Sequence, residues 1–188
     1  MTKIYIYLRN VSTLDISKLK EGLPVNVLNH IEKYKQEIDY TNSLIAWHIL
    51  KRQLKEDFNE TLNIVKFNEY GKPLIENLSF NISHSNNIIV VGISNKTIGI
   101  DIEMEKTINQ EEKIKQLLNL NSSYNSLIEE WTKYEATIKY YGLAIFKKVT
   151  IPQFVKSIKL NDYTNNTYYL SYCVDDTNIE IKNPLTSL

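Results

Sequence analysis

The sequence has little of what marks secreted, membrane-spanning or polyanion-binding proteins. Cys173 is the single cysteine among 188 residues, so no disulfide can form within the chain and a reducing compartment is favoured. Residues 1–9 lack the apolar block of a signal peptide, and no apolar run approaches the ~18 residues that a membrane span needs. The 22 basic residues are balanced by 22 acidic ones, which gives no sign of general nucleic-acid or anionic-membrane binding. We therefore expect a soluble, cytoplasmic protein.

Several common site motifs are also missing. The chain contains no Walker A loop, no glycine-rich dinucleotide fingerprint, no Cys/His zinc spacing and no His-Glu-x-x-His sequence. What it does contain is a 43% hydrophobic content, enough for a sizeable core in one large domain or two small packed halves. Cys173 lies in a strand-like segment without a basic neighbour, which predicts a buried structural thiol.

The hydrophobic pattern predicts strands and helices in both parts of the chain. Strands are expected where short apolar or alternating runs are bounded by turn residues: 1–9, 62–67, 80–83, 88–93, 97–103 and three runs within 153–181. Helices are expected at 42–58, 109–120 and 126–141, the last ending at Gly142. This order predicts an α+β fold with mainly antiparallel sheets, divided into closely packed halves at 1–103 and 104–188.

Two acidic residues share one face of the strand predicted at 97–103. Because side chains alternate along a strand, Asp101 and Glu103 point to the same side, about 7 Å apart along the chain. Gly99 lies on that side as well and would let a ligand approach the backbone. The pair is compatible with an ordinary solvent-exposed strand face or, with a third carboxylate, with a site for a hard divalent cation.

Glu135 is the candidate third carboxylate. It precedes Lys139 by four residues, a spacing typical of a surface helix pair, and spacing alone favours that interpretation. The functional alternative makes Glu135 a metal ligand or a base and Lys139 a cation that faces phosphate. Four large residues fall near one side of the same helix and are expected in the core: Trp131, Tyr134, Ile138 and Tyr141.

Three further polar residues occur at strand ends or turns. Ser83 and His84 are adjacent on a strand and therefore point to opposite faces, which argues against a nucleophilic pair. A structural role or contact with phosphate remains open for both. Lys72 lies in a Gly-Lys-Pro turn, where the proline holds it extended and an anion would be within its reach.

Four motifs together resemble the 4′-phosphopantetheinyl transferases of the surfactin-synthetase-associated type. They are Tyr70-Gly-Lys-Pro73, Phe80-Asn-Ile-Ser-His-Ser85, Ile98-Gly-Ile-Asp-Ile-Glu103 and Trp131-Thr-x-x-Glu-Ala-x-x-Lys139. Each motif alone is weak, whereas four in this order and spacing are specific. The resemblance runs from the first strand to at least Gly142, and the C-terminal strands match only in kind.

The resemblance implies a fold, a reaction and partners. The family is a pseudo-dimer of two similar α+β halves with the active site in the cleft between them. With Mg²⁺ as cofactor, its members transfer phosphopantetheine from coenzyme A to a serine of an apo acyl or peptidyl carrier protein and release adenosine 3′,5′-bisphosphate. The expected partners are therefore coenzyme A and a carrier protein. A fused pseudo-dimer also favours a monomer.

The resemblance also implies roles for individual residues. The implied Mg²⁺ ligands are Asp101, Glu103 and Glu135. Glu135, directly or through water, would also accept the serine proton, and Lys139 would neutralise charge on the phosphate oxygens. The implied contacts to the nucleotide phosphates are Lys72, Ser83 and His84, with His84 on the 3′-phosphate.

The chain departs from the family pattern at three places. Tyr134 stands where the family usually has lysine, and Asn42 where it usually has arginine. Upstream, only Lys33 and Lys35 replace an expected basic cluster, although Lys51 or Arg52 could serve as well. These departures motivate an alternative, a degenerate homologue that binds coenzyme A or a carrier protein without turnover. A metal-dependent phosphodiesterase is a third possibility, disfavoured because no second-metal ligand set is evident.

Overall fold

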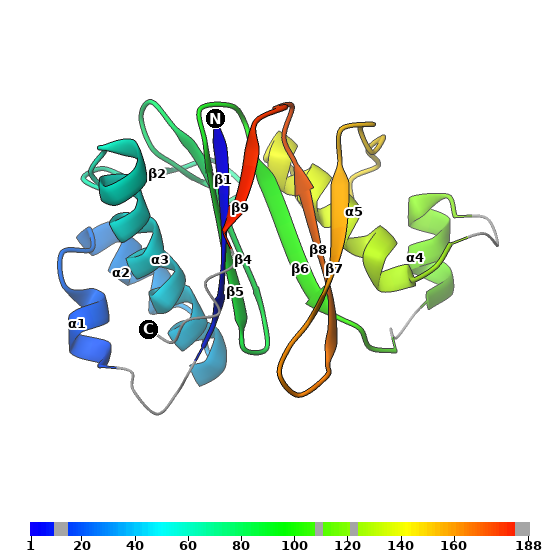
Figure 1. The fold of residues 1–188 in the computed structure, drawn as a ribbon, viewed down its shortest axis with the longest axis horizontal. Helices are drawn as coiled ribbons and strands as arrows, with labels where there is room; N and C mark the ends of the chain where they lie inside the picture. Colours follow the sequence, from blue (N-terminus) through cyan, green and yellow to red (C-terminus); the bar gives the residue numbers. More distant parts are fainter. Residues whose placement is uncertain (10–14, 108–110, 121–123, 183–188) are drawn as a thin grey trace.

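The computed structural model describes residues 1–9, 15–107, 111–120 and 124–182, and it has four layers (Figure 1). Helices α1 to α3 cover one side of a first sheet, a second sheet packs on its other side, and α5 covers the far face of the second sheet. The α+β class with mainly antiparallel sheets is confirmed.

The strands form two principal sheets and one small ribbon. The first sheet has the order β4 (Ser79–Ser85), β5 (Ile88–Ser94), β1 (Thr2–Leu8) and β9 (Ile179–Lys182). The second has the order β6 (Gly99–Met104), β8 (Thr167–Cys173) and β7 (Lys156–Asn161), and the ribbon pairs β2 (Lys66–Phe67) with β3 (Pro73–Leu74). The helices are α1 (Ile16–Lys20), α2 (Val25–Ile31), α3 (Glu37–Phe58), α4 (Glu111–Leu118) and α5 (Leu127–Tyr141).

The alternation in β1 serves two cores at once. Tyr5 and Tyr7 join the cluster beneath the helices, whereas Ile4 and Ile6 join the cluster between the two sheets. Because a layer lies on each side, both faces of the strand are buried, which agrees with the apolar run Ile4–Leu8. Cys173 is likewise buried as a free thiol, as predicted.

Strand β6 alternates in the same way, and this determines how α5 docks. Ile100 and Ile102 lie in the core between the sheets, while Gly99 faces the helix. A Cβ on Gly99 would lie 2.1 Å from the Ala136 carbonyl oxygen and 2.3 Å from the Tyr140 backbone nitrogen. Glycine is therefore required by close approach of the helix backbone, and the expectation that a ligand would occupy this space is wrong.

Most predicted elements are present, with several shifted boundaries. Helix α3 begins at Glu37, five residues before the predicted start, and only Lys66–Phe67 of the strand predicted at 62–67 is formed. Gly142 ends α5 in the left-handed conformation with φ 65°, as predicted. The predicted start of the 109–120 helix lies outside the described residues. Tyr141 is 52% exposed and not in the core, because it follows the last buried turn of α5.

The two sheets exchange strands between the predicted halves. Strand β6 belongs to 1–103 but pairs with β8, and β9 belongs to 104–188 but pairs in parallel with β1. The division at residue 103 and the pseudo-dimer relation stay predictions. No helix in the described part of the chain is long and apolar enough to cross a membrane.

Candidate active site

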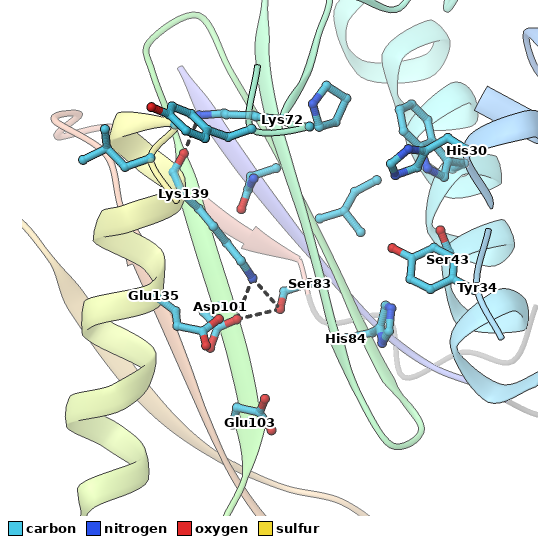
Figure 2. Close-up of a pocket in the computed structure, with 18 residues that line it drawn as sticks. His30, Tyr34, Ser43, Lys72, Ser83, His84, Asp101, Glu103, Glu135 and Lys139 are labelled. Carbon is cyan, nitrogen blue, oxygen red and sulfur yellow. Dashed lines mark hydrogen bonds and ion pairs between the residues drawn. The ribbon is translucent and has the colours of Figure 1, made fainter. Parts of the chain in front are cut away.

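One pocket collects all seven residues that the sequence nominated for metal binding, catalysis or phosphate contact. It has a volume of about 420 Å³ and is lined from α2, α3, the 70–73 turn, β4, β6 and α5 (Figure 2). The nominated residues that line it are Lys72, Ser83, His84, Asp101, Glu103, Glu135 and Lys139. Residues more than sixty positions apart meet in this pocket because α5 docks on β6 and β4, the edge strand of the first sheet, lies next to β6.

Asp101 is the most constrained side chain in the pocket. Its Oδ1 accepts hydrogen bonds from Lys139 Nζ at 2.6 Å and from Ser83 Oγ at 3.0 Å (Figure 2). Its Oδ2 is buried without a hydrogen-bond partner among the described residues. The residue is only 2% exposed, so the expectation of a solvent-exposed strand carboxylate is wrong: α5 covers this face of β6.

The charges of the pocket perturb one another. Burial, followed by the negative charge of Asp101, raises the pKa of Glu135 to about 7. Burial opposes a charge on Lys139, but Asp101 and Glu135 outweigh it and raise the pKa of the lysine. The i, i+4 pair of α5 is therefore part of a charged pocket, and the interpretation as a surface pair is wrong.

The fit of this pocket to Mg²⁺ follows from its donor atoms. Within the described residues, no group of three or more His, Cys, Asp or Glu side chains is arranged as a metal site, and Lys139 is bonded to Asp101. The donors are nevertheless carboxylate oxygens, which Mg²⁺ prefers. Asp101 Oδ2 lacks a hydrogen-bond partner among the described residues, and after burial the charge of Asp101 is the next cause of the raised pKa of Glu135. A bound cation would relieve both. Asp101, Glu103 and Glu135 therefore have the chemistry to hold Mg²⁺ after a local rearrangement.

A row of side chains joins β4 to β6 across the edges of the two sheets. Four alternate side chains of β4, on the face toward the second sheet, accept hydrogen bonds from alternate backbone N–H groups of residues 98–104. The pairs are Ser79 with Ile98 at 3.2 Å, Asn81 with Ile100 at 2.8 Å, Ser83 with Ile102 at 3.3 Å and Ser85 with Met104 at 3.1 Å. We call these four side chains the β4–β6 seam. The sequence signal was the small polar residue at every second position from 79 to 85.

Ser83 and His84 face opposite sides of β4, as expected for neighbours on a strand (Figure 2). Ser83 points to Asp101 and Lys139, whereas His84 points toward Tyr34 and Ser43 on the helical side. Burial lowers the pKa of His84. The two residues therefore line different parts of one pocket.

Lys72 is directed at the end of α5. Its Nζ donates to the carbonyl oxygens of Lys139 at 2.5 Å, of Tyr140 at 3.4 Å and of Ile98 at 3.5 Å. Burial lowers the pKa of Lys72 to about 8. A cation at the C-terminal end of a helix satisfies unpaired carbonyl groups and the negative end of the helix dipole. Its predicted contact with phosphate would require Nζ to leave these carbonyl oxygens.

No family model matches the chain, so the comparison with known proteins rests on individual relatives. The chain is 31% identical over 150 residues to 4′-phosphopantetheinyl transferase gsp of Aneurinibacillus migulanus, covering 73% of this chain and 60% of that protein. It is 33% identical over 117 residues to 4′-phosphopantetheinyl transferase Sfp of Bacillus subtilis (strain 168), covering 60% and 49%. It is 27% identical over 165 residues to 4′-phosphopantetheinyl transferase ffp of Bacillus subtilis, covering 84% and 72%.

The chain is a relative of the 4′-phosphopantetheinyl transferases. The resemblance indicated by the four motifs is thereby confirmed. The alignments span only 60% and 49% of the length of the first two relatives.

The departures from the transferase pattern fall outside the pocket lining. Asn42 is buried, and its Nδ2 donates to the Asn86 carbonyl oxygen at 2.9 Å. Tyr134 is buried, and its hydroxyl donates to the Lys147 carbonyl oxygen at 3.0 Å. Both side chains donate to backbone carbonyl oxygens outside helices and strands, and neither is among the residues that line the pocket.

The basic residues suggested as substitutes are engaged elsewhere or lie outside the pocket lining. Lys51 Nζ donates to the Glu21 carbonyl oxygen, and Arg52 donates to the Tyr7 hydroxyl at 2.8 Å. Lys33 and Lys35 do not line the pocket.

Sequence reasoning missed the aromatic side of the pocket. His30, Tyr34, Trp47 and Tyr70 line it. The His30 ring stacks on Phe67 with centroids 4.7 Å apart, and burial followed by the charge of Lys33 lowers the pKa of His30. The short helix α2 ends at Ile31, which places His30 and Tyr34 at the pocket in place of the lysines.

Proposed function

We propose that this protein transfers 4′-phosphopantetheine from coenzyme A to a serine of an apo acyl or peptidyl carrier protein, with Mg²⁺ as cofactor. The observation that carries the proposal is the pocket in which three carboxylates and Lys139 lie beside an aromatic region. Its volume of about 420 Å³ is within the range of small-molecule sites. The relatives named 4′-phosphopantetheinyl transferase support the same reaction.

The reaction is an in-line displacement at phosphorus. The serine oxygen forms a bond to the phosphorus that carries pantetheine, and the bond from that phosphorus to the bridging oxygen breaks. Adenosine 3′,5′-bisphosphate leaves with the bridging oxygen. Catalysis of such a step depends mainly on positioning and on neutralising charge.

Glu135 and Lys139 are suited to the two sides of this displacement. Glu135, directly or through water, accepts the serine proton, and its carboxylate lies in the same pocket as Lys139. Lys139 carries its charge beside Asp101, and in the complex this charge stabilises the departing phosphate.

Bound Mg²⁺ would be held by Asp101, Glu103 and Glu135 and would supply positive charge to the pyrophosphate oxygens. Ser83 lies within hydrogen-bonding distance of Lys139, at 3.2 Å, and can contribute to the same phosphate environment. His84 faces the aromatic side of the pocket, away from the carboxylates. This placement favours the 3′-phosphate of the nucleotide as the group that His84 contacts.

The direct test is a transfer assay on several carriers. Purified protein is incubated with coenzyme A, Mg²⁺ and a set of apo carrier proteins, and the carriers are analysed by mass spectrometry. The expected result is the mass of one phosphopantetheine group on the carrier serine, absent when that serine is replaced by alanine. Absence of an adduct on every carrier contradicts the proposal. Coenzyme A binding without an adduct would support the degenerate homologue instead.

A further inference from the structure

We propose that Ser85 is a positioning residue for Glu103 and that the β4–β6 seam sets the register of the two strands for this purpose. The inference rests on the proposed function, since Glu103 is there a Mg²⁺ ligand. Ser85 is not among the residues nominated from the sequence. It acts through Glu103 and has no assigned contact with substrate.

Where the two sheets meet, the seam takes the place of backbone-to-backbone hydrogen bonds between β4 and β6. β4 is an edge of the first sheet and β6 an edge of the second, so their backbones do not pair. Instead, each of the four seam side chains accepts one backbone N–H from residues 98–104, at distances between 2.8 and 3.3 Å. Because the bonds repeat every second residue on both strands, a slip by one position would break all four.

The last two seam serines have a second hydrogen bond that the first two seam residues do not show. Ser83 Oγ donates to Asp101 Oδ1 at 3.0 Å, and Ser85 Oγ donates to Glu103 Oε2 at 3.2 Å. A hydroxyl has one proton, and the backbone N–H already occupies a lone pair, so this proton is directed at the carboxylate. Each serine therefore links the backbone of β6 to an acid on the same strand.

Glu103 depends on this link more than Asp101 does. Asp101 has a second partner in Lys139, with which it forms an ion pair. The second partner of Glu103 is Lys106, whose Nζ lies 3.2 Å from the same Oε2 that accepts from Ser85. The Lys106 side chain is 54% exposed and that of Glu103 is 27% exposed, so their ion pair is weak and screened by solvent. Without Ser85, Glu103 would gain rotamer freedom that metal binding must remove again.

The seam contains its own matched control. Ser79→Ala removes the acceptor for Ile98 N, just as Ser85→Ala removes the acceptor for Met104 N, but Ser79 donates to no carboxylate that the structure shows. Both variants should lose a similar amount of thermal stability. Only Ser85→Ala should weaken metal binding, by about tenfold, the lower end of the range for partners that orient metal ligands.

The experiment measures Mn²⁺ affinity by electron paramagnetic resonance in the presence of coenzyme A, together with melting temperature. A second pair, Ser85→Thr and Ser85→Val, keeps similar shape and differs in the hydroxyl, so it separates the hydrogen bond from packing. We expect wild type, Ser79→Ala and Ser85→Thr to bind Mn²⁺ alike, and Ser85→Ala and Ser85→Val to bind about tenfold more weakly.

The possible outcomes separate this inference from the proposed function. Equal Mn²⁺ affinity in Ser85→Val and Ser85→Thr overturns the positioning role and leaves the proposed function intact. Failure of wild type to bind Mn²⁺ with coenzyme A overturns the metal site and, with it, both proposals. If Ser85→Ala does not fold, the Thr/Val pair alone decides.

Discussion

The two ends of the pocket are built in different ways. The acidic end lies on β6 and α5, whose backbones meet at Gly99, and its side chains are held by Lys139 and the seam. The aromatic end lies at the end of α2 and on the 70–73 turn, and there the His30 ring stacks on Phe67.

The carboxylates and Lys139 keep the family pattern, whereas the departures at Asn42 and Tyr134 lie outside the pocket lining. The carboxylates and Lys139 share one closely packed strand–helix contact, in which a change at any position disturbs the others. Under the proposed function we expect the aromatic end to tolerate replacement, because a purine and its phosphate can be bound by rings, hydroxyls or cations in several arrangements. We therefore expect changes at the acidic end to affect turnover and changes at the aromatic end to affect affinity for coenzyme A.

The largest effect is expected for Asp101→Ala. Transfer should fall by about 10³-fold, because a group that stabilises the reacting charge is lost. The melting temperature should also fall, since Lys139 loses the partner that lies 2.6 Å from its Nζ. Single-turnover kinetics and calorimetry measure the two effects, with Asp101→Asn as the variant that preserves shape. Full activity would remove Asp101 from the site.

A smaller effect, confined to binding, is expected for His84→Ala. The KM for coenzyme A should rise about 10- to 100-fold with little change in kcat, the cost of one hydrogen bond to a charged group. The comparison substrate is coenzyme A lacking its 3′-phosphate, with which wild type and variant should behave alike. A fall in kcat with unchanged KM would contradict this prediction and indicate that His84 acts in turnover, as expected for the acidic end.

Lys72→Met tests a residue that links the two ends. The free energy of unfolding should fall by about 1 kcal/mol, because a cation at the C-terminal end of α5 is lost. Hydrogen exchange of the Gly142 and Leu143 amides, which bond to the last turn of α5, should become faster in the free protein. Unchanged exchange with a raised KM for coenzyme A would instead support the phosphate contact predicted from sequence.

The remaining effect concerns the pH dependence of stability without metal. The pKa of Glu135 is raised from 4.5 to about 7, so the folded state binds the extra proton between these values. Its stabilising contribution is present below pH 4.5 and is lost as the pH rises through 7. Melting temperatures in chelator should therefore drop between pH 5 and pH 8, and Glu135→Gln should lessen this drop. Glu130→Gln, on the same helix, is the control.

Much of the fold followed from local patterns. Alternation placed β1 and β6, a short apolar run placed β5, and the 3.6-residue period placed most of α3 and α5, because these patterns depend on neighbouring residues alone. Boundaries were less accurate: Lys66–Phe67 is all that forms of the strand predicted at 62–67, since pairing with β3 lasts only two residues. The return of β9 to the first sheet was not visible from any local pattern.

The sequence by itself nominated the candidate site residues. Four ordered motifs nominated seven side chains, and all seven line one pocket. Only the tertiary structure decided their surroundings: Asp101 is buried, Lys72 caps α5, and Ser85 contacts Glu103. The physical reason is that these contacts depend on how closely α5 and β4 approach β6. That approach is decided by packing between segments distant in sequence, at Gly99 and along the seam, and neighbouring residues do not encode it.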